Sequence, residues 1–238
     1  MSRAERLSER ELFYERFADD FDDQMNRYEV MKRIRIVFED VIPGSLSGVR
    51  MLDAGCGTGR FSAMAADRGA DVTSLDVGER LLAKVAEKCD SHRIVGSAEH
   101  VPFADATFDV VLCTEVLEHL RSPRRAVDEL ARVLRPKGRL IITTPNRAWL
   151  PTVRLASALR LRPYEGIENW VWPRALRSWL QESGVVVERF GGFNALPFVH
   201  PVLYPLVDRL DALGATRFAP DLMINVLAVG TRATSPVH

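Results

Sequence analysis

The stretch 49–59 constrains the fold more than any other part of the chain. A short apolar run, VRMLDAG, leads into the spacing Gly55-x-Gly57-x-Gly59. An apolar run that ends in glycine is typical of a buried strand followed by a tight turn. Because glycine has no Cβ, the backbone of such a turn can approach a ligand closely. We therefore expect a buried strand with a binding loop at its carboxyl end.

Downstream of this loop, short apolar segments alternate with helical patterns. Helices are expected at 58–68, 79–89, 122–135 and 173–183. Strands are expected at 49–55, 71–76, 93–96, 108–114, 138–145, 185–193 and 223–231, the last two as a hairpin. Strands that alternate with helices form a mainly parallel sheet covered on both faces. The sequence thus predicts a Rossmann-like, doubly wound α/β fold with a seven-stranded sheet, mostly parallel with an antiparallel last strand.

Other segments flank or interrupt this α/β pattern. Over residues 4–42, apolar side chains spaced by three and four predict an amphipathic helix or a helix pair. We expect residues 1–44 to form an N-terminal helical cap and residues 45–238 to form the main domain. The segments 145–172 and 194–222 are too long for simple connectors, so we expect them to build the substrate side.

Composition argues against several classes of protein. Lys and Arg number 32, and so do Asp and Glu, so the basic excess of a nucleic-acid-binding protein is absent. Three widely spaced cysteines, Cys56, Cys89 and Cys113, match neither a metal-binding nor a disulfide pattern. The first residues lack an apolar signal core, and no segment approaches the roughly 20 apolar residues that span a bilayer. We expect a cytoplasmic protein with no nucleic-acid partner.

The glycine spacing discriminates between nucleotide cofactors. A dinucleotide-binding loop has the pattern G-x-G-x-x-G, but Arg60 stands where its third glycine belongs, which disfavours a nicotinamide-dependent oxidoreductase. Asp53, two residues before Gly55, would repel a diphosphate. Asp76 ends the next strand, where an ionised carboxylate can accept hydrogen bonds from two ribose hydroxyls. The pattern favours a nucleoside without a diphosphate that carries a zwitterionic amino acid.

With these residues the chain resembles the class I S-adenosylmethionine (SAM)-dependent methyltransferases. LDAGCGTG looks like their first motif, Asp76 like their ribose-binding acid, GSAEHVPFADATFDVV like their adenine-enclosing segment, and RVLRPKGRLIITTP like their fifth-strand motif. The resemblance covers residues 45–145 closely and the rest in outline. It implies that the cofactor is SAM. The residues expected to bind it are Asp53, Gly55, Cys56, Gly57, Asp76, Val77, Ser97, Ala98, Glu99 and Thr114.

The resemblance also implies a role for each part of this set. Residues 53–57 would lie along the methionine part, and Asp76 would hold the ribose. Val77 and residues 97–99 would enclose the adenine. Family members often have Asp at the position of Ser97, whose hydroxyl makes a weaker contact with the adenine amino group.

The same resemblance makes the N-terminal helices a cap over the cofactor. Four aromatic side chains of this segment are available to face it: Phe13, Tyr14, Phe17 and Phe21. Packing against the edge of the sheet is the alternative role for these side chains.

Catalysis is expected in the string Glu115-Val116-Leu117-Glu118-His119, which follows the fourth strand. Together with TPNR at 144–147, this string resembles the O-methyltransferases of ubiquinone biosynthesis. The resemblance implies that Glu115, Glu118 and His119 hold a divalent metal such as Mg²⁺, for which carboxylates and an imidazole are suitable ligands. Similar strings occur in methyltransferases without a metal, where Glu118 and His119 cap and orient the turn. As a catalytic role, we favour His119 as general base.

The function expected from these features is transfer of a methyl group to a small-molecule acceptor. The favoured target is an oxygen of a phenolic, quinol-like or other ring-containing metabolite. N- or C-methylation on the same scaffold, or a non-catalytic SAM-binding protein, are the alternatives. Residues 148–162 mix Trp and Leu with three Arg, so weak peripheral membrane contact is a further hypothesis.

Overall fold

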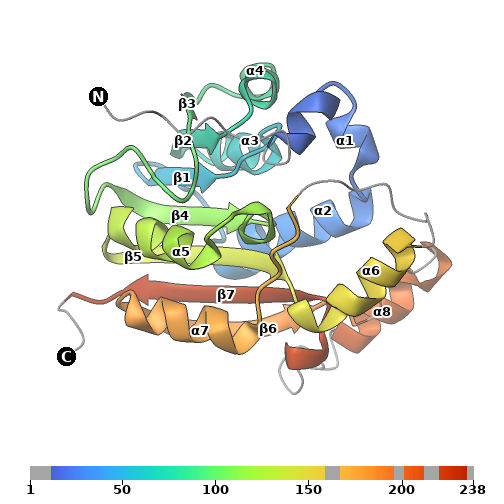
Figure 1. The fold of residues 1–238 in the computed structure, drawn as a ribbon. Coiled ribbons are helices and arrows are strands. Elements are labelled where there is room, and N and C mark those ends of the chain that lie inside the picture. The colour runs from blue at the N-terminus through green and yellow to red at the C-terminus, as the bar shows by residue number, and fades with distance from the viewer. Residues whose placement is uncertain (1–11, 159–166, 196–200, 212–219, 235–238) are drawn as a thin grey trace.

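The computed structural model describes residues 12–158, 167–195, 201–211 and 220–234, which form a central sheet with helices on both faces (Figure 1). Within these residues the sheet has seven strands in the order β3-β2-β1-β4-β5-β7-β6. Their bounds are β1 Arg50–Ala54, β2 Asp71–Asp76, β3 His92–Val95, β4 Phe108–Thr114, β5 Leu134–Pro145, β6 Val185–Phe193 and β7 Asn225–Arg232. Neighbouring strands pair in parallel except at β7, which runs antiparallel to β5 and β6. The predicted fold is confirmed.

Helices cover both faces of this sheet with their apolar sides. The main ones are α2 Arg27–Arg35, α3 Arg60–Asp67, α4 Glu79–Ala86, α5 Pro123–Val133 and α7 Pro173–Glu182. Successive side chains of a strand point to opposite faces. In β4, Val111 and Cys113 therefore join the core under α5 and α7, while Val110 and Leu112 join the core under α2 and α3. Because β4 contributes to both cores, its sequence, FDVVLCT, is almost continuously apolar.

The carboxyl ends of β1 and β4 mark the point where the strand order reverses. A ligand crevice forms at such a point in open α/β sheets. The loop after β1 turns there through Gly55, Gly57 and Gly59, whose φ angles are 75°, 54° and 81°. A Cβ on Gly55 would lie 2.3 Å from Val116 Cγ2, so no larger residue fits without movement. Glycine is needed here both for its backbone conformation and for space.

The N-terminal segment differs from the predicted helix or helix pair over 4–42. From residue 12 onward it forms η1 (Phe13–Phe17), the single-turn α1 (Phe21–Gln24), α2, and a π-helical segment, η2 (Ile36–Val41). The chain breaks before α2 because Asn26 Oδ1 accepts hydrogen bonds from the backbone of Tyr28 and Glu29, which makes Asn26 the N-cap. The predicted helix over residues 4–11 lies outside the described residues.

The two predicted insertions form short helices beyond the carboxyl ends of β5 and β6. Their helices are η4 Arg147–Trp149, α6 Leu150–Ala158, η5 Pro201–Leu203, α8 Tyr204–Leu210 and η7 Pro220–Leu222. Trp149 Nε1 donates to the carbonyl of Leu222 (3.1 Å), which joins the two insertions. The ring of Tyr204 stacks on Tyr28 of α2 at 3.8 Å between centroids. Among the described residues no helix combines the length and apolarity needed to cross a bilayer.

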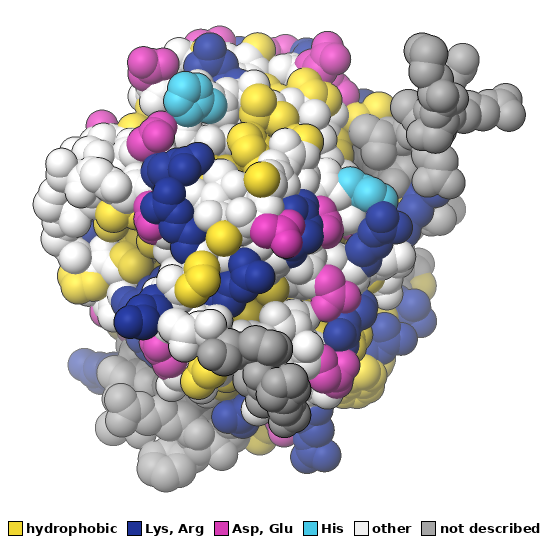
Figure 2. All heavy atoms as spheres, turned by 90° about the vertical axis from the view of Figure 1, so that its left-hand side faces the viewer, with side chains coloured by type: hydrophobic (Ala, Val, Ile, Leu, Met, Phe, Trp, Pro, Cys, Tyr) yellow, Lys and Arg dark blue, Asp and Glu magenta, His cyan; other side chains and the backbone are white. Residues whose placement is uncertain are grey.

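The opposite end of the molecule, at the amino ends of the parallel strands, carries mixed charge. Figure 2 shows basic and acidic side chains interspersed on this face. An ion pair of 2.6 Å joins Arg135 near the start of β5 to Asp109 near the start of β4. The mixture agrees with the balanced charge of the whole chain.

A buried polar network lies beneath the glycine loop. Asp53, with 1% of its surface exposed, accepts a hydrogen bond of 2.7 Å from the Ser62 hydroxyl of α3. Ser74 of β2 contacts the hydroxyls of both Ser62 and Ser91. Burial raises the pKa of Asp53 to about 6, although the bond from Ser62 acts in the opposite direction. Ionisation of this carboxyl at neutral pH therefore lowers the free energy of unfolding.

We predict that Asp53→Asn removes a stabilisation that the wild-type protein gains as the pH falls. A carboxyl whose pKa is raised on folding destabilises the fold above that pKa, and the cost disappears as pH falls toward the unfolded value. From about pH 7.5 to about pH 4.5, this group should stabilise the wild-type protein by about 2 kcal/mol, a gain that the variant lacks. Urea unfolding at both pH values measures the difference. Asp67→Asn, at an exposed position of α3, is the control, and an unchanged pH dependence in Asp53→Asn contradicts the assignment.

Candidate active site

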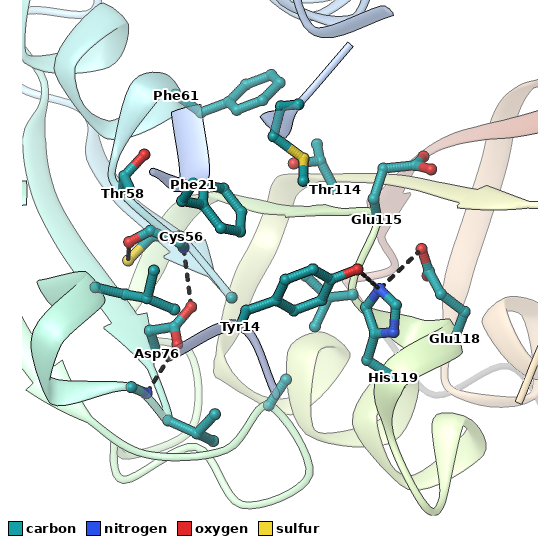
Figure 3. Close-up of a pocket in the computed structure, with 18 of the residues that line it drawn as sticks. Tyr14, Phe21, Cys56, Thr58, Phe61, Asp76, Thr114, Glu115, Glu118 and His119 are labelled. Carbon is teal, nitrogen blue, oxygen red and sulfur yellow. Dashed lines mark hydrogen bonds and ion pairs between the residues drawn. The ribbon is translucent and has the colours of Figure 1, made fainter. Parts of the chain in front are cut away.

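A cavity of about 410 Å³ lies at the carboxyl ends of β1, β2 and β4. The predicted residues that line it are Gly55, Cys56, Gly57, Asp76, Val77, Ser97, Ala98, Glu99, Thr114, Glu115, Glu118 and His119. They come from four separate loops, which the topology of the sheet brings to one edge. Figure 3 shows several of these side chains around the cavity, with Asp76 at one end and His119 at the other.

Asp53 is the predicted cofactor residue that lies elsewhere. It is absent from the described lining of the cavity and is bonded to Ser62 beneath the loop. Side chains alternate along β1, so Asp53 shares the α3 face with Met51, while Leu52 and Ala54 face the other core. A direct contact between the Asp53 carboxylate and the methionine part does not fit this placement. From this position the Asp53 carboxylate can support the glycine loop from beneath.

Asp76 ties the glycine loop to the end of β2. Its two carboxylate oxygens accept hydrogen bonds of 2.9 Å from the backbone amides of Gly57 and Gly78 (Figure 3). Burial raises the pKa of Asp76, and bonds from the amides of Gly78, Gly57 and Val77 act to lower it. A carboxylate has lone pairs to spare after two such bonds, so Asp76 can still accept from ribose hydroxyls.

The loop after β3 forms the wall expected to enclose adenine. The Ser97 hydroxyl accepts a hydrogen bond from the amide of Glu99 (3.2 Å). The Glu99 carboxylate accepts one of 2.6 Å from the amide of Ser122. Both side chains therefore shape the loop itself, while Ala98 is buried beside them.

Acidic side chains attach the N-terminal segment above the glycine loop. Asp22 accepts hydrogen bonds from the Thr58 hydroxyl (2.6 Å), from Arg60 Nε (2.9 Å) and from Lys88 Nζ (2.6 Å). Partial burial by itself raises the pKa of Asp22, but the bonds from Lys88, Thr58 and Arg60 lower it to about 2. The carboxylate is therefore ionised at neutral pH and pairs with cations on both α3 and the turn after α4.

The aromatic residues of this segment differ in what they contact. Tyr14 and Phe21 line the cavity and contact each other edge to face. The rings of Phe13 and Phe17 pack against each other, with centroids 5.3 Å apart. A Cβ on Gly57 would lie 3.5 Å from the Phe21 ring, so the segment rests directly on the glycine loop.

At the opposite end of the cavity, His119 makes contacts through both of its ring nitrogens. Its Nδ1 lies 3.2 Å from the carbonyl oxygen of Ile167, and its Nε2 lies 3.3 Å from the Tyr14 hydroxyl and 3.7 Å from a carboxylate oxygen of Glu118 (Figure 3). A carbonyl oxygen only accepts hydrogen bonds, so in the neutral ring the proton belongs on Nδ1. The lone pair of Nε2 then faces Tyr14 and the cavity. This geometry suits a general base.

Glu115, Glu118 and His119 line one cavity, but they do not form the predicted metal site. One Glu118 oxygen accepts from the Thr144 hydroxyl (3.1 Å), and burial followed by the charge of Glu115 raises the pKa of Glu118. Glu115 turns toward a cation, Arg33. Within the described ranges, no group of three or more His, Cys, Asp or Glu side chains is arranged to hold a metal ion. The Mg²⁺ prediction does not fit these residues.

Arg33 is the main site residue that sequence reasoning missed. It lines the cavity from α2 with 8% of its surface exposed, and its Nη1 lies 3.6 Å from Glu115 Oε2. Two buried atoms here, Arg33 Nε and Glu115 Oε1, have no hydrogen-bond partner among the described residues. A buried guanidinium and a half-buried carboxylate, each with an unused polar atom, complement a zwitterion, so the cavity fits the amino-acid part of SAM. An arginine at an apolar-face position of α2, between Val30 and Val37, was the available signal.

Comparisons with known proteins agree with this geometry. Residues 52–142 match the family model described as a methyltransferase domain. The ubiquinone biosynthesis O-methyltransferase of Xylella fastidiosa (strain 9a5c) is 34% identical over 179 residues, which cover 70% of this chain and 72% of that protein.

Solved structures share the fold at lower sequence identity. A possible histamine N-methyltransferase from Thermotoga maritima superposes with a TM-score of 0.65 and 21% identity over 92% of this chain and 97% of that one. Magnesium protoporphyrin IX methyltransferase from Synechocystis PCC 6803, solved with bound SAH, gives a TM-score of 0.64 and 18% identity over 94% and 98% of the two chains. With its matched domain, its relative and a cavity suited to an adenosyl amino acid, the chain belongs to the class I SAM-dependent methyltransferases.

Proposed function

We propose that this methyltransferase transfers the methyl group of SAM to an oxygen of a small, ring-containing acceptor such as a phenol or quinol. The observation that carries the proposal is the contact between the Tyr14 hydroxyl and His119 Nε2 at 3.3 Å. Tyr14 is itself a phenol, so this contact supports a role of His119 Nε2 as acceptor of a hydrogen bond from a phenolic hydroxyl. The similarity to an O-methyltransferase of ubiquinone biosynthesis supports the same class of acceptor.

The residues at this end of the cavity can perform the proton transfer. An acceptor hydroxyl that reaches His119 Nε2 from the cavity donates its proton to this nitrogen as the oxygen attacks the methyl carbon. When bound, SAM supplies the methyl group, and its sulfur keeps the electron pair of the broken C–S bond. The proton on His119 Nε2 then lies close to a carboxyl oxygen of Glu118, 3.7 Å from the nitrogen. The N-terminal segment over the cavity excludes water and aligns the reacting groups.

Charge around the cavity favours a neutral acceptor over an anionic one. Glu29 and Glu118 both line the cavity. Burial raises the pKa of the Glu29 carboxyl, the positive charge of Arg33 opposes this rise, and the charge of Glu115 adds to it. A second anion beside these carboxyls would raise their pKa values further, so the site disfavours an acceptor carboxylate or phosphate, whereas a hydroxyl can donate to them. Trp170 adds an aromatic wall, as small-molecule pockets usually have.

The cofactor is held at two places in this proposal. Asp76 accepts from the ribose hydroxyls at one end. At the other, Arg33 pairs with the cofactor carboxylate and Glu115 with its ammonium group, which assigns a partner to each unused buried atom. Glu115 is thereby a cofactor-binding residue, in place of the catalytic role expected from the sequence.

For the ribose contact, we predict that Asp76→Ala weakens SAM binding by roughly 1.5–3 kcal/mol, the scale of hydrogen bonds to charged groups. Calorimetry with SAM measures the dissociation constant. Asp71→Ala, at the exposed amino end of the same strand, is the matched control and should bind SAM like the wild-type protein. An unchanged dissociation constant in Asp76→Ala would refute the ribose assignment.

For the amino-acid head, we predict that Arg33→Gln and Glu115→Gln discriminate between two ligands. S-adenosylhomocysteine (SAH) carries the head, and 5′-methylthioadenosine lacks it. Each variant should lose on the order of tenfold in affinity for SAH and much less for 5′-methylthioadenosine. Arg35→Gln, on the exposed side of the same helix, should change neither affinity. Equal losses for both ligands would show that Arg33 and Glu115 do not bind the head.

For catalysis, we predict that phenols or quinols accept label from methyl-labelled SAM in a screen that also contains sugars and amines. His119→Ala should lower this turnover about 10²-fold or more while SAM affinity stays within about twofold. EDTA should have no effect, because the carboxylates and His119 are not arranged around a metal. Methylation of amines that persists in His119→Ala contradicts the oxygen-acceptor proposal.

A further inference from the structure

Glu115 holds its carboxylate in the cavity from a strained backbone. Its φ angle is 55°, in the left-handed region that non-glycine residues rarely adopt. The amide of Glu115 donates to the carbonyl of Thr143 in β5 (2.8 Å), which fixes the backbone at the end of β4. Strain of this kind persists where surrounding contacts enforce it, and it concentrates at functional sites. The contacts that enforce the side-chain position are therefore of interest.

A chain of buried amides leads away from this carboxylate. Asn225, the first residue of β7, donates from Nδ2 to Glu115 Oε2 (3.0 Å). Asn194, directly after β6, donates from its own Nδ2 to Asn225 Oδ1 (3.1 Å). Each asparagine has only 4% of its surface exposed. Asn194 also has a left-handed backbone, with a φ angle of 61°.

The direction of this chain is fixed by chemistry. A carboxylate only accepts hydrogen bonds, so Asn225 must present its NH₂ group to Glu115 and its carbonyl oxygen to Asn194. Asn194 must then present its NH₂ group in turn. Rotating either amide would place two oxygen atoms together. The two amides thus act as an aligned pair behind the carboxylate.

The far end of the chain returns to α2. The backbone amide of Asn194 donates to Asp211 (3.0 Å), and Asp211 forms an ion pair of 2.7 Å with Lys32. Lys32 precedes Arg33, whose guanidinium faces Glu115. The chain therefore connects the two charged groups of the proposed head-group site through the end of the β6–β7 hairpin.

We propose that Asn225 and Asn194 are positioning residues that hold the Glu115 carboxylate for the ammonium group of the cofactor. The proposal rests on the assignment of Arg33 and Glu115 to the cofactor head. Asn225 fixes one carboxylate oxygen and leaves the other, Oε1, without a partner and available to the ligand. Asn194 acts one step further back, by orienting the amide of Asn225. Buried amides are costly unless they are hydrogen-bonded, and the Nδ2 group of each asparagine has an acceptor here.

The test compares affinities for SAH and 5′-methylthioadenosine by calorimetry in Asn225→Leu and Asn194→Gly. Leucine is close to asparagine in size and lacks its donors. Glycine adopts a positive φ angle without strain, so Asn194→Gly removes the amide and keeps the backbone. Affinity for SAH should fall on the order of fivefold to tenfold in Asn225→Leu and less in Asn194→Gly, with 5′-methylthioadenosine affected about twofold at most.

Asn146→Leu is the matched control. Asn146 is a buried asparagine at the end of the adjacent strand β5, and its amide donates to the carbonyls of Asp221 and Met223. Asn146→Leu should destabilise the protein about as much as Asn225→Leu does, measured as a shift in melting temperature. It should not change the ratio of the affinities for SAH and 5′-methylthioadenosine. A ratio that stays at the wild-type value in Asn225→Leu overturns the proposal, as does an equal change in all three variants.

A double variant separates this proposal from the one it rests on. If Asn225 acts through Glu115, adding Asn225→Leu to Glu115→Gln should lower SAH affinity little further. If Glu115→Gln loses more affinity for SAH than for 5′-methylthioadenosine and Asn225→Leu does not, only the positioning role is overturned. If Glu115→Gln affects both affinities equally, the head-group site itself is overturned.

Discussion

The hydrogen bonds from the amides of Gly57 and Gly78 to the Asp76 carboxylate are the interaction on which the rest of the site depends. They join the loop after β1 to the end of β2 and so fix the crevice at the point where the strand order reverses. Three glycines at alternate positions adopt a left-handed backbone conformation, which allows the loop to turn under that restraint. The adenine wall, the cap and the acceptor end are all arranged around this loop. A class I methyltransferase binds its cofactor where sheet topology alone already creates a depression.

The polar groups at the end of the cavity opposite Asp76 lower the stability of the fold and suit the function. Arg33 and Glu118 are buried, and burial raises the pKa of the Glu118 carboxyl. The left-handed backbone of Glu115 adds strain. A protein selected for stability alone would fill this place with apolar side chains. Its polar content is instead what a zwitterionic cofactor head and a proton transfer require.

Local patterns predicted the repeating parts of the structure well. Strand β4 has the bounds expected from its apolar run, because a strand buried on both faces is continuously apolar. The helix boundaries in the N-terminal segment were not predicted, because apolar spacing does not show that Asn26 ends one turn and starts the next helix. The placement of the Asp53 carboxylate beneath the glycine loop was not predicted for a different reason. A glycine motif gives the position of an acidic residue in the chain but not the face of the strand to which it points.

The layer order, the glycine loop, SAM as the class of cofactor and the edge of the sheet where chemistry occurs could all be predicted from the chain, because periodicity and glycine spacing are local properties. Which charged side chains meet could be seen only in the folded protein. Tyr14 reaches His119 across 105 positions of sequence, and Asn225 reaches Glu115 across 110. Such pairs depend on strand register and on the seating of helices, to which distant segments contribute together. No local pattern specifies them, so the ligand set of the site emerged only from the fold.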